Sequence, residues 1–233
     1  MSTEANDLSN REILLPQLGL IHPAFELFVQ KIIGSFSKDT LADLRSDFHG
    51  RLRLTLTQPS SNQLVEDLWD FFYDWCVFEK KLMDQVSSLT QAEKVIWEHA
   101  KDTNVRGVFS VARADNDSLK LSELYTGKTY WVLRREKNDF LGIARSDMLE
   151  ARLVEDPEHS NRSQGQMYNF IRTPTYHPIQ VHSYLKKKVR SFRKLNDPTS
   201  YGSWMWLLIG MYLKHRLYEQ MPIERIYDDQ SRI

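Results

Sequence analysis

The spacing of apolar residues changes twice along this chain, and the change constrains its fold more than any other feature of the sequence. Up to about residue 105, and again after about 173, apolar residues recur every three to four positions, as in helices that bury one face. Between these parts they alternate with polar residues in short segments rich in Val, Leu, Phe, Tyr and Trp. The sequence therefore predicts an α+β protein, mostly helical, with a small five- to six-stranded antiparallel, barrel-like β module inserted between helical parts.

The same change of period divides the chain into four segments. We expect a flexible arm at 1–20, a helical part at 21–105, the β module at 106–172, and C-terminal helices at 173–233 that pack with the first helical part. A chain of 233 residues that is 41% hydrophobic has enough apolar surface for such a core.

Caps and turn residues set the expected element boundaries. His22-Pro23 begins one helix, Asp39 is the expected N-cap of the next, and Thr90 with Glu93 forms a capping box. Helices are expected near 23–36, 39–50, 63–86, 91–103, 179–195 and 200–219. Strands are expected at 107–113, 118–124, 128–134, 140–145 and 148–154, with a sixth at 167–171.

The cysteine count and the polar N-terminus bear on location and metal chemistry. Cys76 is the single cysteine, which excludes an intrachain disulfide and a zinc site built from several thiolates, and favours a reducing compartment. Met1–Asn10 lacks the basic start and apolar stretch of a signal peptide. We therefore expect a cytoplasmic protein with no metal and no cofactor.

The longest apolar run, Trp204–Leu213, is about half the length that a membrane-spanning helix needs. It predicts either a buried core helix or a contact between copies of the chain. A structural homo-oligomer that associates through Trp204 and Trp206 is therefore one hypothesis for this protein.

Charge is balanced overall and uneven along the chain. The numbers of basic and acidic residues are 10 and 16 in 1–105, 11 and 10 in 106–172, and 10 and 5 in 173–233. The zero net charge gives no global attraction to nucleic acid or membrane, but the chain is acidic at its front and basic at its end.

The most suggestive motif is a group of six cations within 186–194. Lys186, Lys187, Lys188, Arg190, Arg193 and Lys194 lie on a helix whose core-facing residues are Val181, Leu185, Val189 and Phe192. Lys187, Arg190 and Lys194 then form an exposed stripe that attracts nucleic-acid phosphate, anionic lipid or an acidic partner. Basic stripes on amphipathic helices are more often solvated faces, or faces paired with carboxylates of the same chain, and this is the alternative explanation.

The β module offers a second cationic group beside aromatic residues. Arg134, Arg135 and Lys137 lie on a turn near Trp131, a combination that small barrels use to bind nucleic acid. Packing alone also explains the aromatic residues, because alternation places Tyr130 and Trp131 on opposite faces of a strand.

Catalytic motifs are absent from the sequence. It contains no Gly-x-Ser-x-Gly elbow, no glycine-rich phosphate loop and no His-Glu-x-x-His. The remaining enzyme hypothesis is a site assembled from scattered residues, in which Glu66, Asp70 and Asp74 on one helix face meet His177 and His182. A solvated acidic face, or one that pairs with the basic C-terminal helix, is the alternative.

Three short segments carry a resemblance to a known kind of protein. They are FFYDWCVF at 71–78, LYTGKTYWV at 124–132 and DMLEARLV at 147–154. Over about 70–154 the chain resembles the segment that precedes the cysteine-rich SEC-C motif in bacterial proteins of unknown function. The resemblance implies a bacterial cytoplasmic protein with helices and a small β module; it transfers no catalytic residue, and the metal-binding motif itself is missing.

These observations favour a non-enzymatic binding or regulatory protein over an enzyme. The β module and the basic helix would contact a macromolecular partner, either nucleic acid or an acidic protein. The residues predicted to bind it are Lys186, Lys187, Arg190, Arg193, Lys194, Arg134, Arg135 and Trp131.

Overall fold

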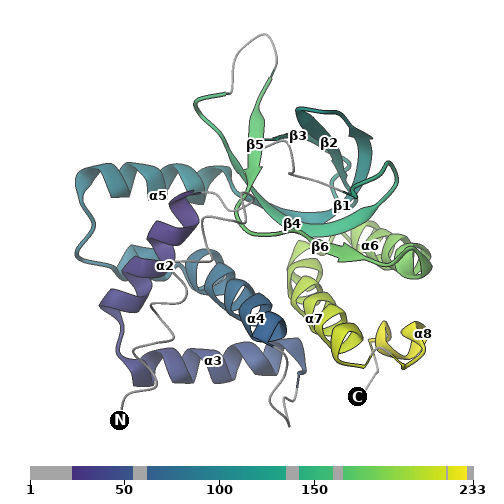
Figure 1. The fold of residues 1–233 in the computed structure, drawn as a ribbon, viewed down its shortest axis with the longest axis horizontal. Helices are drawn as coiled ribbons and strands as arrows, with labels where there is room; N and C mark the ends of the chain where they lie inside the picture. The colour runs from purple at the N-terminus through teal and green to yellow at the C-terminus, as the bar shows by residue number, and fades with distance from the viewer. Residues whose placement is uncertain (1–22, 55–61, 135–141, 160–164, 219, 230–233) are drawn as a thin grey trace.

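The computed structural model describes residues 23–54, 62–134, 142–159, 165–218 and 220–229, except for the side chains of residues 23 and 62–67. It has a helical part, a β barrel and a C-terminal group of helices (Figure 1). The predicted arm at 1–20 lies outside the described residues.

The helical part precedes the barrel in the sequence. It consists of α2 (Pro23–Ser35), α3 (Lys38–Leu52), α4 (Asn62–Asp74) and α5 (Gln91–Thr103), with a π-helical turn at Trp75–Glu79 and a 3-10 turn at Leu82–Gln85. The capping box of α5 is confirmed: Thr90 Oγ1 accepts from the Glu93 N–H, and Glu93 accepts from the Thr90 N–H. The N-cap of α3 is Ser37 rather than Asp39.

The single long helix expected at 63–86 is wrong. After Asp74 the helix widens into the π-helical turn, and Lys81, with φ 52°, lies in the left-handed region. The four consecutive residues Trp75–Phe78 are all buried, which one face of a regular α-helix does not permit. The wider turn lets this aromatic segment bury every side chain in the core.

The β module is a closed barrel. Its strands are β1 (Val105–Ala114), β2 (Ser118–Glu123), β3 (Thr129–Leu133), β4 (Met148–Glu155) and β5 (Met167–Phe170), with β6 (Thr175–His177) added beside β4. Neighbouring strands pair around the ring in the order β1-β2-β3-β5-β4, and β4 pairs again with β1. The prediction of a small barrel is confirmed.

One strand pair differs from the predicted antiparallel sheet. β3 and β5 are parallel, with Trp131 opposite Met167, while the other pairs are antiparallel. A closed ring of five strands contains five neighbouring pairs. Because five is odd, strand directions cannot alternate all the way round, and at least one pair must be parallel. The strand expected at 140–145 is not present in its described part, residues 142–145, which forms a turn and loop.

Apolar side chains fill the barrel. Phe109, Leu121, Tyr130, Leu149 and Phe170 belong to one buried cluster drawn from all five barrel strands. The interior is therefore a packed core rather than a ligand cavity.

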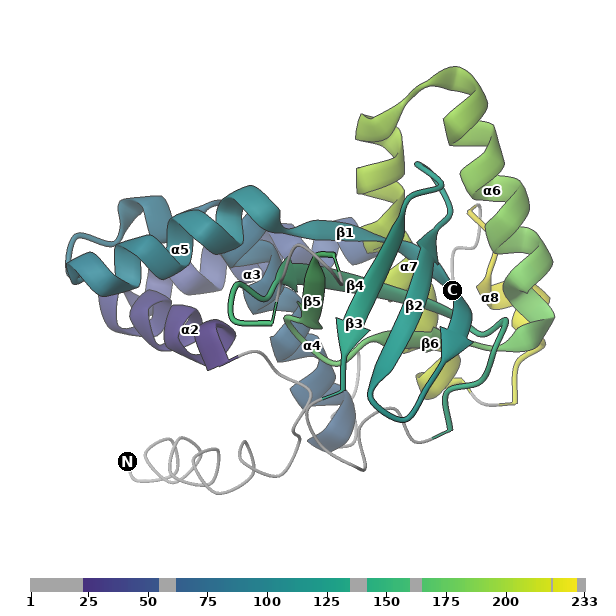
Figure 2. The same ribbon diagram turned by 90° about the horizontal axis from the view of Figure 1, so that it is seen from above.

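The C-terminal helices form a projecting hairpin. A short 3-10 turn (Ile179–Val181) leads into α6 (His182–Leu195), and α7 (Pro198–Leu217) runs back beside it before the short α8 (Ile223–Ile226). Asn196 ends α6 in the left-handed region and Asp197 caps α7, so the connection is tight. In Figure 2 the joined ends of α6 and α7 extend beyond the barrel.

α7 also packs on the helical part. Trp206, Ile209 and Leu213 share a core cluster with Phe48 and Leu52 of α3. None of the helices within the described ranges is long and apolar enough to cross a membrane.

Candidate functional site

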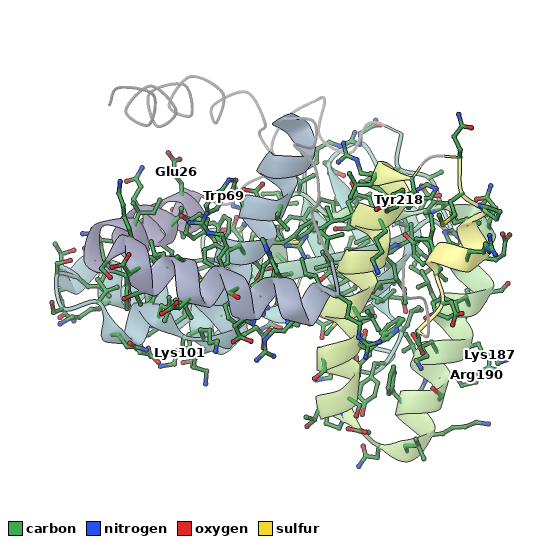
Figure 3. The ribbon with its side chains drawn as sticks, turned by 90° about the horizontal axis from the view of Figure 1, so that it is seen from below. Glu26, Trp69, Lys101, Lys187, Arg190 and Tyr218 are labelled. Carbon is green, nitrogen blue, oxygen red and sulfur yellow. The ribbon has the colours of Figure 1, made fainter. Side chains whose placement is uncertain are left out.

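The outward face of α6 carries a concentration of cations. Val181, Leu185 and Val189 are buried, whereas Lys186, Lys187, Arg190, Arg193 and Lys194 are exposed. Figure 3 shows Lys187 and Arg190 on the side of α6 that faces away from α7. The predicted orientation of this helix, with its apolar side toward the core and its cations outward, is therefore confirmed.

The five exposed cations of α6 have no carboxylate to neutralise them within the described part of the chain. The helix itself contains no Asp or Glu, and its ion pair is Lys188 Nζ with Asp229, a residue that also accepts from Tyr184 Oη. Asp74, on the acidic helix face, does not pair with the basic helix, because its ion-pair partners are Arg152 and Arg172.

Two polar contacts fix the α6–α7 hairpin against the rest of the molecule. Tyr201 Oη of α7 donates to Glu123 Oε1 (2.8 Å) and accepts from the N–H of Val108 (2.9 Å), and the Tyr201 ring stacks on Tyr125 with centroids 4.8 Å apart. At the other end, the Asp229 carboxylate accepts hydrogen bonds from Tyr184 and Lys188 of α6, and the Asp229 carbonyl accepts one from Arg53. The basic face is thus presented on a fixed support.

The residues predicted on the β module lie on the β2–β3 hairpin. Trp131 is half-buried on the outer face of β3, with Lys120 Nζ 5.4 Å from its ring centroid. Arg134 Nη1 donates to the carbonyl of Asn116 at 3.1 Å. Arg135 lies outside the described residues. The structure gathers the five cations of α6 on one helix, whereas Trp131 and Arg134 belong to a separate element with its own contacts.

Trp204 and Trp206 are interior residues of the single chain. They are 5% and 3% exposed, and Trp206 packs edge-on against Phe48 at 5.6 Å. The expectation that they form a contact surface between copies is therefore wrong for these side chains, because the monomer already covers them.

A buried ion network, which the sequence reasoning missed, joins α4 to the barrel. Asp74 accepts from Arg152 Nε (2.6 Å) and Arg172 Nε (2.7 Å), while Glu150 accepts from Arg172 Nη2 (2.5 Å) and Arg106 Nε (2.8 Å). Burial by itself raises the pKa of Asp74 and of Glu150, but the adjacent guanidinium groups hold both below their usual values. The signal in the sequence was charge at alternate positions, 150 and 152, of an otherwise apolar strand.

The network has the character of structure rather than of catalysis. Arg106 lies flat on Trp206 with its Cζ 3.4 Å from the ring centroid, and Arg152 and Arg172 lie over Phe78 and Phe71. Every carboxylate oxygen of Asp74 and Glu150 has an arginine donor. These charges hold the barrel against α4 and α7.

Asp74, His177 and His182, three predicted members of the scattered enzyme site, each have partners within the protein. Asp74 is buried in the network, and His177 is buried with Nδ1 3.1 Å from Tyr227 Oη. Burial lowers the pKa of His177 to about 4, so its ring is neutral at pH 7. His182 Nε2 is 3.0 Å from the carbonyl of His177, and the side chain of Glu66 lies outside the described residues.

A groove of about 820 Å³ lies elsewhere, at the end of α7. Its lining is Arg216, Leu217, Tyr218, Gln220, Met221, Pro222 and Arg225. It contains none of the residues predicted for catalysis or for partner binding.

Asp156, Glu158 and His159 form a small cluster of potential metal ligands. Asp156 already accepts from the N–H groups of Glu158 and His159 and from Asn169 Nδ2. Burial by itself raises the pKa of Asp156, but these hydrogen bonds lower it to about 2. The cluster is therefore explained by a turn that the Asp156 side chain closes.

No protein-family model, curated protein or solved structure matches this chain. The resemblance of about 70–154 to the segment preceding the SEC-C motif stays a prediction. Function must therefore be argued from the geometry of the chain itself.

Proposed function

We propose that this chain is a non-enzymatic nucleic-acid-binding protein of the bacterial cytoplasm, and that the basic face of α6 contacts the phosphate backbone. One observation carries the proposal: five exposed cations on a helix without carboxylates, none of them ion-paired within the described residues. Unpaired cations in a row bind a polyanion by releasing its condensed counterions.

The surroundings of the cations favour a phosphate polymer over a protein partner. Stable protein interfaces have an apolar core inside a polar rim. On α6 the apolar residues Val181, Leu185 and Val189 are buried in the monomer, and the strongly exposed Ile179 and Leu195 lie at opposite ends, before the first turn and at the last residue. The basic face thus offers charge without an apolar anchor.

The same burial argues against a membrane surface as the partner. An interfacial helix inserts its apolar face among the lipid tails. The apolar face of α6 is packed on α7 and its neighbours, so it is not available to insert among lipid tails. The exposed cations match nucleic acid, whose duplex carries one negative charge per about 1.7 Å of its axis.

Trp131 on β3 and Arg134 directly after it are proposed as a second contact, and Arg135, predicted with them, lies outside the described residues. Their contribution is tested separately from that of α6, because they lie on a different element. If W131A leaves the affinity unchanged, the contact is restricted to α6.

The proposal is tested by reversing charge on α6. The variant K187E/R190E changes two exposed side chains that make no hydrogen bond or ion pair among the described residues, so the fold is retained. We expect its affinity for a short fluorescent DNA duplex, measured by anisotropy at low salt, to fall at least about 100-fold, since two contacts are replaced by two repulsions.

The matched control is K94E/R145E. Lys94 on α5 and Arg145 before β4 are both exposed, and their reversal changes the net charge of the chain by the same amount. We expect this control to bind nearly as well as the unmodified protein. Equal losses in both variants, or no binding by the unmodified protein, contradict the proposal.

A further inference from the structure

The aromatic side chains around α6 are already used inside the protein. Phe192 is half-buried between Tyr201 and Trp204, with centroid distances of 6.1 and 5.7 Å. Tyr125 stacks on Tyr201, and the Tyr184 hydroxyl donates a hydrogen bond to Asp229. None of these rings is free to receive a base.

The rings inside the barrel are committed in the same way, and Trp131, half-buried on the outer face of β3, lies on a separate element whose contribution W131A tests. Tyr130 meets Phe109 and Tyr168 edge-on within the barrel interior, at 5.9 and 5.1 Å. Within the described residues, the exposed large aromatic side chains are Tyr176 and Tyr218, and neither lies on α6. The basic face is therefore a row of cations without a stacking platform.

This combination bears on the form of nucleic acid that the face can bind. Proteins that bind single strands use aromatic side chains as platforms for successive bases, together with cations for the backbone. A duplex keeps its bases stacked internally and presents two phosphate backbones to cations. A face with cations and no free ring has the contacts that a duplex needs and lacks those that a single strand needs.

The dimensions of α6 agree with a duplex ligand. Lys186 to Lys194 spans eight residue steps, or about 12 Å at a rise of 1.5 Å per residue. A duplex carries one charge per about 1.7 Å of axis, so about seven phosphates lie within that length. The helix that carries the cations is held in place by Asp229 and by its packing on α7, which Tyr201 anchors to the barrel.

We infer that α6 selects double-stranded over single-stranded nucleic acid. The inference rests on the proposed function and adds the class of ligand. Its test compares oligo(dT) with the oligo(dA)·oligo(dT) duplex of the same length, by fluorescence anisotropy at one salt concentration. We expect the unmodified protein to bind the duplex at least about tenfold more tightly.

A gain-of-function variant supplies the missing platform. Ser183 is exposed and lies four residues before Lys187, on the same side of α6. We expect S183W to bind oligo(dT) at least about fivefold more tightly than the unmodified protein, because an indole can then stack a base beside the cations. Duplex affinity should change by less than about twofold. S183A is the matched control and should leave both affinities unchanged.

The outcomes separate the two proposals. Equal or tighter binding of oligo(dT) by the unmodified protein, with loss of both ligands in K187E/R190E, overturns the duplex inference and leaves the proposed function standing. Failure to bind either oligonucleotide overturns both. Binding to anionic vesicles alone, in the absence of oligonucleotide binding, also overturns both, since the ligand is then a lipid surface.

Discussion

The crossing of α3 and α7 makes a sharp prediction about Gly210. A Cβ atom built on Gly210 lies 2.0 Å from the carbonyl oxygen of Leu52, whereas real Cβ contacts essentially never fall below 3.0 Å. The opposing atom belongs to the backbone, so it cannot rotate away as a side chain would. In G210A the two helices must therefore separate by about 1 Å.

The magnitude follows from two opposing effects. Alanine is favoured over glycine in a helix by about 1 kcal/mol. Forced separation of a packed core costs about 1–3 kcal/mol or more, and the movement here also disturbs the contact of Trp206 with Phe48. The cost exceeds the gain, and we expect G210A to lower the free energy of unfolding by about 1–2 kcal/mol.

Gly202 of the same helix provides the control. A Cβ built there meets nothing within 4 Å, so G202A should gain only the helix preference and stabilise the protein by about 0.5–1 kcal/mol. Urea unfolding followed by tryptophan fluorescence measures both variants. Equal stabilisation by the two alanines would refute the close crossing of α3 and α7.

Three further predictions concern buried polar groups. The pKa of His177 is near 6.5 in the unfolded chain and about 4 in the folded protein, so the unfolded chain binds more protons between these pH values. The free energy of unfolding should therefore fall by up to about 3 kcal/mol from pH 6.5 to pH 4. Urea unfolding at several pH values measures this change, and H177Q should lose this part of the pH dependence. Y201F leaves the buried Val108 N–H without its acceptor and removes one of the hydrogen bonds to Glu123, so we expect a loss of about 1–3 kcal/mol by the same assay; an unchanged midpoint would contradict the anchoring role. Burial raises the pKa of Cys76 to about 12, so a thiol reagent at pH 8 should react with it only after denaturation, and rapid reaction of the folded protein would show that this thiol is accessible.

The sequence predicted those parts of the fold that local signals determine. The capping box at Thr90 and Glu93, the change of period near Gly107 and the amphipathic pattern of 181–192 are each set within a few residues of chain. Each has its expected counterpart in the structure. The barrel as a whole was also predictable, because short alternating strands at close spacing have few ways to bury one face.

Features that depend on distant parts of the chain were not predictable in this way. The π-helical turn at Trp75–Glu79 is favoured by the burial of four consecutive side chains against several elements, none of which is visible in the local pattern. The parallel pairing of β3 with β5 follows from closure of a five-strand ring, which a strand list does not reveal. In the same way, the sequence leaves open whether Trp204 and Trp206 are core residues or a contact between copies until α3 and α6 are placed beside α7.

The candidate site, too, was predictable from the sequence only in part. The orientation of the cations on α6 follows from helical geometry and was predicted, but their lack of ion-pair partners among the described residues could be established only once Asp74, Glu150 and Asp229 had been assigned theirs. The arginine network was missed because charged residues in strands are ordinarily placed at the surface. Its three arginines come from residues 106, 152 and 172, which no local pattern connects.

The salt dependence of duplex binding tests the central proposal most directly. If the five cations of α6 contact phosphates, a plot of log K against log salt concentration has a slope of up to about −4.5, since each phosphate contact contributes about −0.9. Loss of Lys187 and Arg190 in K187E/R190E should reduce the size of that slope by about 2, with K94E/R145E unchanged. A slope near zero, or one that is the same in K187E/R190E as in the unmodified protein, would contradict the assignment of α6 as a nucleic-acid-binding surface.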